Sequence, residues 1–206
     1  MPVPVDSKKR ALGRKRLVRS LRGAYSGELA AGHAYHGHAS SVRRPDERAR
    51  IFVIEDEEWN HRRLVGAMLR DLGERPSLVR ETVFWLIGRT LSVVCHLSGW
   101  LVPMYGAGFL ESGNVREYVD AARHAASSGH AELVPCLLEM AEVEWEHEHY
   151  FRERVLLHPL ARFLPLWKPP PPHREIRRPF AKLLKARASR RPPAAVVAEA
   201  ASPWSE

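Results

Sequence analysis

Apolar residues recur at steps of three and four along most of the chain, and no segment keeps a two-residue alternation. Steps of three and four are typical of amphipathic helices, whereas strands alternate apolar and polar residues. Asn-Gly and Asp-Gly, the usual hairpin turns, do not occur. The pattern therefore predicts an all-α protein.

Turn and helix-breaking residues divide the pattern into four helical stretches. The first is expected to begin near residue 12 or 21 and to end at residue 38, and the second to cover residues 46–72. The third is expected over residues 78–126, broken or kinked at Pro103, Gly106 and Gly108. The fourth is expected from just after Gly129 to about residue 157. Four stretches of this length predict an antiparallel four-helix bundle.

The chain changes character after residue 160. Pro169 to Pro172 form one run, which favours an extended linker or a strap that wraps the bundle. Residues 179–188 are expected to form a short basic helix, and residues 192–206 to be disordered. We therefore expect a basic N-terminal extension (1–20), a four-helix domain (21–160) and a Pro-rich basic C-terminal extension (161–206).

The apolar seam of the second helix is interrupted by two polar residues. Ile51, Ile54 and Val65 follow the three-and-four rule, and Glu58 and His61 occupy the positions that complete the series. A carboxylate and an imidazole in a bundle core are costly unless a partner satisfies them, and a metal cation satisfies several such groups at once.

The fourth helix repeats this interruption. Glu144 and His147 stand in its apolar seam, and the sequence Glu-Trp-Glu-His repeats the Glu-Trp-Asn-His that begins at Glu58. If the chain has two related halves, each preceding helix should supply one more inward Glu. Glu28 lies 30 residues before Glu58, and Glu111 lies 33 residues before Glu144. Each pair would then be level in an antiparallel hairpin.

Four Glu and two His in this order form the ligand set of di-iron and di-manganese carboxylate bundles. Carboxylates can bridge two cations and change their binding mode, while each imidazole supplies one nitrogen ligand. We predict two iron ions as cofactor, with manganese able to occupy the same positions. The predicted metal-ligating and catalytic residues are Glu28, Glu58, His61, Glu111, Glu144 and His147.

Three alternatives remain open at this level. Glu146 and His149 form a second, overlapping Glu-x-x-His, and Glu117 competes with Glu111 as the ligand of the third stretch. A simpler interpretation treats these charged residues as a solvated helix face, with Glu58 paired to Arg62 at i,i+4 spacing.

The net charge of +8 is unevenly distributed. Residues 1–22 carry +7 and residues 168–206 carry +6, so the intervening segment carries −5. Cys95 and Cys136 are the two cysteines and form no Cys-x-x-Cys pair, which excludes a rubredoxin-type iron site and a disulfide framework. No apolar secretion signal follows the basic N-terminus, and we expect a cytoplasmic protein.

The same residues resemble a known family of ferritin-like di-iron enzymes, the demethoxyubiquinone hydroxylases. The likeness begins at Leu21-Arg22, includes Ser26-Gly27-Glu28 and Tyr35-x-Gly37, and continues through residues 58–61, 111–118 and 144–147. The resemblance implies a ferritin-like bundle with the same six ligands. The family has Asp-His-Ala-Gly-Glu where this chain has residues 24–28, and a His at Glu117.

The expected function is an oxygen-dependent di-iron monooxygenase acting on an apolar, quinone-like substrate, as the resemblance implies. Its partners would be dioxygen and an electron donor or reductase, since no nucleotide-binding glycine loop is present. A homodimer is a further candidate assembly. The alternatives are a ferritin- or rubrerythrin-like di-iron oxidase or peroxidase, and a non-enzymatic bundle that binds membranes or nucleic acid through its basic tails.

The membrane alternative rests on residues 90–110, which carry no formal charge. Their His, Ser, Pro and Gly content favours a helix that lies in the membrane interface over one that spans the bilayer. Basic ends would contact anionic lipid at the inner face of a membrane, with Phe180, Leu183 and Leu184 inserting shallowly. Nucleic acid is the weaker candidate partner because both tails contain few aromatic residues for base stacking.

Overall fold

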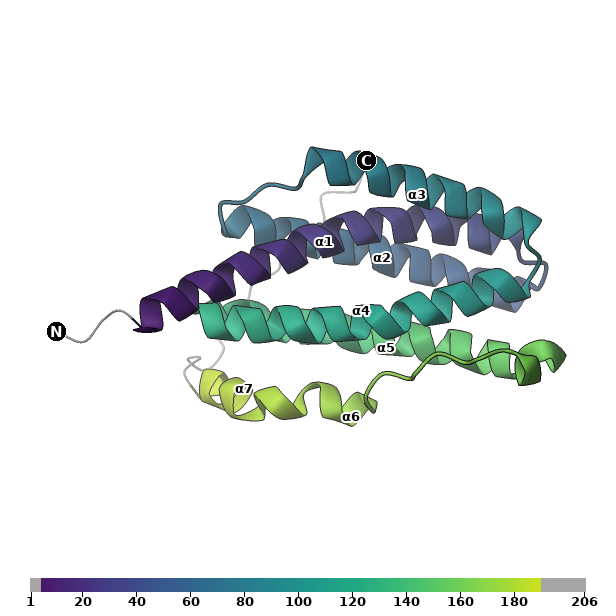
Figure 1. Ribbon diagram of the computed structural model, residues 1–206. Coiled ribbons are helices and arrows are strands. Elements are labelled where there is room, and N and C mark those ends of the chain that lie inside the picture. The colour runs from purple at the N-terminus through teal and green to yellow at the C-terminus, as the bar shows by residue number, and fades with distance from the viewer. Residues whose placement is uncertain (1–4, 190–206) are drawn as a thin grey trace, which may run out of the picture.

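The computed structural model describes residues 5–189, and those residues form helices and connecting loops without a strand (Figure 1). The long helices are α1 (Val5–Ser41), α2 (Pro45–Asp71), α3 (Leu78–Leu97), α4 (Leu101–Ser128) and α5 (Val134–Leu156). Shorter helices are α6 (His173–Ile176), α7 (Ala181–Ala188) and the 3-10 turns η1 (Ala131–Leu133), η2 (Pro159–Phe163) and η3 (Arg178–Phe180). The all-α prediction is confirmed.

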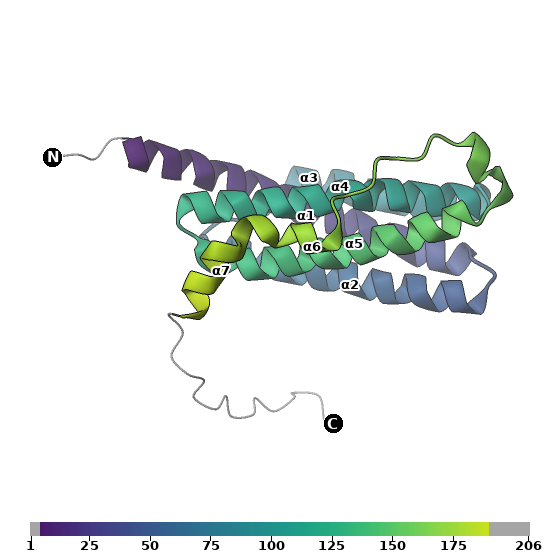
Figure 2. The ribbon, with the colours of Figure 1, turned by 90° about the horizontal axis from the view of Figure 1, so that it is seen from below.

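Four of the long helices form the bundle. α1 packs antiparallel to α2, α4 packs antiparallel to α5, and α1 contacts α4 (Figures 1 and 2). α3 is the connection between the two hairpins: it returns along the outside of α1 and makes few contacts with α4. The predicted four-helix bundle is thus confirmed, with α3 added as a fifth helix on its surface.

The ends of the bundle helices follow from local sequence. Pro45 occupies the first turn of α2, where its missing N–H is not needed. Gly73 closes the same helix with φ 70°, and Gly129 closes α4 with φ 91°, a backbone conformation that glycine adopts without a steric penalty. Backbone N–H groups of Gly73 and Glu74 then bond to the last carbonyls of α2.

The third stretch breaks at a different place from the one predicted. The break expected at Pro103, Gly106 and Gly108 lies instead at residues 98–100, where Gly99 has φ 75°. Pro103 is the third residue of α4, so it removes a backbone N–H that has no intrahelical partner. Gly106 and Gly108 lie inside α4, and the Trp167 ring packs directly over Gly108.

The apolar core has two halves. One is centred on Leu17, Leu21, Val65 and Leu137, and the other on Ile54, Met104 and Phe151. Each bundle helix contributes to both halves, and each carries its predicted ligand positions in the stretch between them. A polar layer therefore separates the two halves at mid-bundle.

The C-terminal segment packs on the bundle on the side opposite α3 (Figure 1). Trp167, Ile176 and Phe180 are buried, and Leu183 and Leu184 pack against the core. The expectation that Phe180, Leu183 and Leu184 insert into a membrane was therefore wrong, because these side chains already cover the bundle. The expected disorder of residues 192–206 lies outside the described residues.

At the other end of the chain, α1 begins at Val5 and continues without a break into the bundle, where Leu17 and Val18 are buried. The division of the chain at residues 20 and 160 stays a prediction.

A close helix contact tests the placement of α3. A Cβ atom at Gly88 would lie 2.6 Å from the carbonyl oxygen of Ala30 on α1, whereas one at Gly106 would meet no atom within 4 Å. We expect Gly88→Ala to lower the free energy of unfolding by about 1–3 kcal/mol, since rigid backbone would have to move. Gly106→Ala should raise it by about 0.5–1 kcal/mol because alanine restricts the unfolded chain. Urea unfolding measures both, and equal effects would contradict the packing of α3 on α1.

Candidate metal centre

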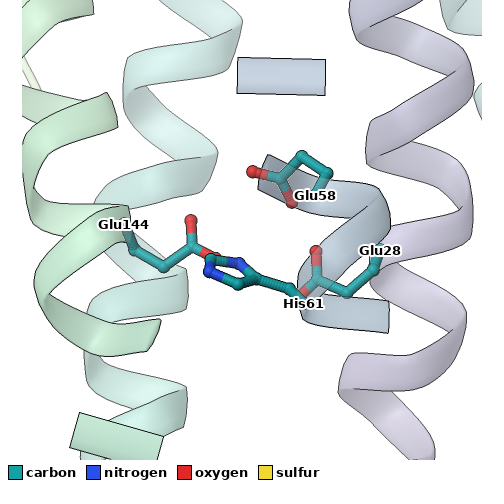
Figure 3. A group of neighbouring side chains, drawn as sticks. All are labelled: Glu28, Glu58, His61 and Glu144. Carbon is teal, nitrogen blue, oxygen red and sulfur yellow. The ribbon is translucent and has the colours of Figure 1, made fainter. Parts of the chain in front are cut away.

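The structure brings all six predicted ligands together in the polar layer. They form two overlapping groups, and within each group the potential ligand atoms lie within 4.8 Å of one another. Their members are Glu28, Glu58, His61 and Glu144 in the first group and Glu58, Glu111, Glu144 and His147 in the second. Figure 3 shows the first group, whose side chains point toward one another from α1, α2 and α5.

Glu58 and Glu144 belong to both groups, and each comes from a Glu-x-x-His segment. This sharing is the arrangement expected for carboxylates that bridge two cations, with His61 on one side and His147 on the other. Glu28 completes the first group and Glu111 the second. All six side chains belong to residues that are at most 4% exposed.

Several buried ligand atoms have no hydrogen-bond partner among the described residues. These atoms are both carboxylate oxygens of Glu58, Oε2 of Glu144 and Nδ1 of His147. His147 Nδ1 lies 3.1 Å from Glu58 Oε1 and 3.6 Å from Glu144 Oε2, but neither contact has hydrogen-bonding geometry. Unsatisfied buried polar atoms are rare in folded proteins and call for a further partner.

The electrostatics of the cluster are those of carboxylates crowded away from water. Burial, together with the charge of Glu144, holds the pKa of Glu58 and of Glu111 well above the usual range, and burial raises the pKa of Glu28. Burial would also raise the pKa of Glu144, but its contacts with His147 and His61 outweigh that effect and hold it well below the usual range.

Burial shifts the pKa of a histidine in the opposite direction from that of a carboxylate. Burial alone would lower the pKa values of both histidines, yet Glu144 raises the pKa of His61, and Glu144 with Glu57 and Glu58 raises that of His147 well above its usual value. Without a cation, the carboxylates and imidazoles of the cluster would thus have to share protons to limit their charge. A divalent cation would replace those protons and satisfy the same oxygens and nitrogens.

Two tyrosines and an asparagine hold the outer carboxylates. Tyr35 OH donates to Oε1 of Glu111, and Asn114 Nδ2 donates to Oε2 of the same residue over 2.8 Å. Tyr118 OH donates to Oε1 of Glu28. These bonds orient the carboxylates while leaving further lone pairs for a cation.

Sequence reasoning missed Asn114 and Glu57 as parts of the site. Asn114 lies one helical turn after Glu111, a spacing that could have identified it. Glu57 contacts His147 Nε2 at 2.7 Å, but the two residues are on different helices and no local pattern links them.

The predicted alternatives lie elsewhere. Glu146 and His149 are exposed on the outer side of α5, where His149 faces Glu153 at 3.4 Å. Glu117 is absent from both ligand groups and lines a neighbouring cavity instead. Arg62, proposed as the partner of Glu58 in the solvated-face interpretation, bonds to Glu81 on α3.

The donor set fits two divalent cations. Carboxylate oxygens and imidazole nitrogens are the ligands that iron and manganese prefer, and the residues with unpartnered atoms, Glu58, Glu144 and His147, belong to one ligand group. The fit rests on this geometry, while the role of each residue as a ligand and the identity of the metal stay predictions.

An apolar cavity of about 490 Å³ reaches the cluster from the α3 side. Glu28, Glu111, Tyr35 and Tyr118 form its inner wall, and α1, α3 and α4 form the rest. This volume lies in the range of small-molecule pockets. Its outer wall is contributed by Phe84, Ile87, Leu91, Val94 and Cys95 of α3.

His38 is one of the polar residues in the lining of this cavity. Its ring is stacked near Tyr35 and Phe151, it is 2% exposed, and its Nε2 has no hydrogen-bond partner among the described residues. Burial lowers the pKa of His38 to about 4, so the imidazole is neutral at pH 7. A neutral imidazole can both donate and accept a hydrogen bond.

Comparison with known families identifies a partial relationship. The family model of ubiquinone biosynthesis protein COQ7 matches residues 15–106, a little under half of the chain. This segment contains Glu28, Glu58 and His61 but not Glu111, Glu144 or His147. The resemblance to the demethoxyubiquinone hydroxylases is confirmed over this segment, and the ligand roles of all six residues stay predictions.

Curated relatives carry the corresponding name. Proteins of Francisella tularensis subsp. tularensis and subsp. novicida named 3-demethoxyubiquinol 3-hydroxylase are 31% identical to this chain over 81 residues. The matched stretch covers 39% of this chain and 38% of each relative. The comparison therefore spans well under half the length of these relatives. No solved structure matches the chain.

A substitution at Glu58 distinguishes a metal-binding site from a cluster whose role is only structural. In metal-free protein we expect Glu58→Gln to raise the free energy of unfolding by about 1 kcal/mol, because it removes an unpartnered carboxylate from a crowded site. Adding Fe²⁺ or Mn²⁺ at about 100 times its Kd should stabilise the wild-type protein by about 2.7 kcal/mol. The variant should lose this gain. Thermal unfolding with and without metal measures both effects.

Glu47→Gln is the matched control, because Glu47 is equally buried but lies outside the cluster and accepts a bond from Trp100. This variant should keep the full stabilisation by metal. The metal site would be contradicted if the Glu58→Gln protein were less stable than the wild type without metal, yet were stabilised by metal as much as the wild type.

Proposed function

We propose, from the likeness of residues 15–106 to ubiquinone biosynthesis protein COQ7, that this chain is a di-iron monooxygenase that hydroxylates an apolar, quinone-like ring. The observation that carries the proposal is the apolar cavity whose inner wall includes two of the six ligand candidates, Glu28 and Glu111. A site that oxidises only iron or peroxide has no need of such a cavity, so its size and lining favour an organic substrate.

The six residues would hold two iron ions, and Glu58 and Glu144 belong to both ligand groups, each of which contains one histidine. Bound iron supplies the reactivity toward dioxygen that the side chains lack. The protein's own contribution is to place a ring beside the centre and to exclude water from it. The apolar walls from α1, α3 and α4 serve both purposes.

Polar groups along the cavity can orient a ring that carries oxygen substituents. His38 offers its unpartnered Nε2, while Asn114 and Glu117 line the wall on α4. His38 lies ten residues beyond Glu28 on α1, roughly 15 Å along the helix axis. His38 also lies one turn beyond Tyr35, whose hydroxyl bonds to Glu111, so a substrate group held by His38 would lie near the Glu111 end of the cluster.

The proposal is tested by oxygen incorporation. We expect iron-loaded protein, given a chemical reductant, ¹⁸O₂ and a short-tailed demethoxyubiquinol, to yield a hydroxylated product that contains one ¹⁸O atom, as measured by mass spectrometry. Glu58→Gln should reduce the rate by at least about 100-fold, because it removes a carboxylate shared by both cations. Glu47→Gln should retain activity.

Other outcomes would select another function. Hydrogen peroxide consumption or iron oxidation without any hydroxylated ring would support the oxidase or peroxidase alternative. A purified protein that retains neither iron nor manganese would support the third alternative, a non-enzymatic bundle. The same assay can identify the source of the two electrons. For this purpose NADH replaces the chemical reductant, with and without an added reductase.

We also propose that the outer face of α3 rests on a membrane surface. None of the helices within residues 5–189 is both long and apolar enough to cross a bilayer. On α3, however, Leu78, Leu86 and Leu97 are 82%, 60% and 80% exposed, and Arg80 and Arg89 are exposed beside them. Apolar residues flanked by basic ones suit the interface of an anionic membrane, and the inner face of the same helix lines the cavity.

Vesicle binding tests this surface. We expect the protein to sediment with vesicles of anionic phospholipid, and the double variant Leu86→Gln and Leu97→Gln to bind at least about tenfold more weakly, since each change removes exposed apolar area. The control is Leu156→Gln with Leu157→Gln, which alters two equally exposed leucines at the end of α5. Equal binding by the two double variants would contradict the assignment to α3.

A further inference from the structure

Glu57 contacts the imidazole of His147 from outside the metal cluster. Oε2 of Glu57 lies 2.7 Å from Nε2 of His147, while Nδ1 on the other side of the ring faces Glu58 and has no hydrogen-bond partner. When Nε2 carries the proton and donates it to Glu57, the lone pair of Nδ1 is free for a cation. The contact thus selects the tautomer that a ligand requires.

The environment of Glu57 keeps its carboxylate available for this bond. The side chain is 35% exposed, and Arg50 Nη1 lies 3.4 Å from the same Oε2. A charged acceptor on the outer nitrogen increases the basicity of the ligating nitrogen.

The other half of the site lacks this support. The residue that precedes Glu58 is Glu57, whereas the residue that precedes Glu144 is Val143, which has no acceptor on its side chain. His61 Nδ1 faces Glu144 at 3.0 Å, and no carboxylate within residues 5–189 bonds to its Nε2. Glu111 in the His147 group is also held by two donors, against one for Glu28.

We propose that Glu57 is a positioning residue that fixes His147 as an Nδ1 ligand and makes the cation position of Glu58, Glu111, Glu144 and His147 the tighter of the two. This inference rests on the proposed metal centre but not on its substrate. The two cations would therefore bind in sequence, first beside His147 and then beside His61.

Stepwise titration of the metal-free protein with Co²⁺ tests the proposal, followed by visible absorption and calorimetry. The wild type should bind two ions in distinguishable steps. Glu57→Val, which copies Val143, should weaken the tighter step by about 10- to 100-fold and leave the weaker step unchanged. Glu57→Gln should lose less, because its amide oxygen still accepts a bond from Nε2.

Glu55→Gln is the matched control, since Glu55 is on the same helix and faces His36 rather than the cluster. It should leave both steps unchanged. A lower melting temperature of the metal-free Glu57→Val protein with both affinities intact would make Glu57 merely structural and overturn the inference. Two steps that weaken equally would also overturn it. Absence of Co²⁺ binding to the wild type would overturn the metal centre itself, a result distinguishable from the other two.

Discussion

The packing of the bundle maintains one unfavourable arrangement: four carboxylates and two imidazoles form a nearly solvent-free layer across its middle. Burying charged groups costs several kcal/mol for each ion unless a partner compensates. The two apolar half-cores on either side hold the four helices in register and force the layer to form. Packing energy from the ends of the bundle therefore maintains a polar centre that would separate on its own, and a bound cation would compensate this cost.

The bonds around the layer limit how it can relax. Tyr35 and Tyr118 reach in from α1 and α4 to the carboxylates of the other helix, so each outer ligand is held by a hydroxyl from across the bundle. Glu57 does the same for His147 from α2. Because these partners come from different helices, a ligand cannot turn away without disturbing a neighbouring helix. The centre is thus preorganised by tertiary contacts rather than by the helix that carries each ligand.

The sequence was sufficient for the features that are local or periodic. The helical class, the polar interruptions at Glu58 and Glu144, and the level placement of Glu28 follow from spacing, and the structure brings these residues together. The break before α4 was misplaced because Pro103 was taken as a helix breaker, although a proline in the first turn costs no hydrogen bond. The Glu57 contact and the burial of Phe180 depend on elements distant in sequence, and no single-helix pattern encodes them.

The separate position of α3 has a consequence for how such a protein can diverge. α3 supplies none of the six cluster residues, yet its inner face forms an entire side of the cavity. Substitutions at Phe84, Ile87 or Leu91 can therefore reshape the cavity without changing any of the six cluster residues, whereas changes in the four bundle helices affect the cluster directly. The outer wall of the cavity and the polar cluster are therefore encoded on different parts of the chain, so the shape of the cavity can diverge while the cluster stays the same.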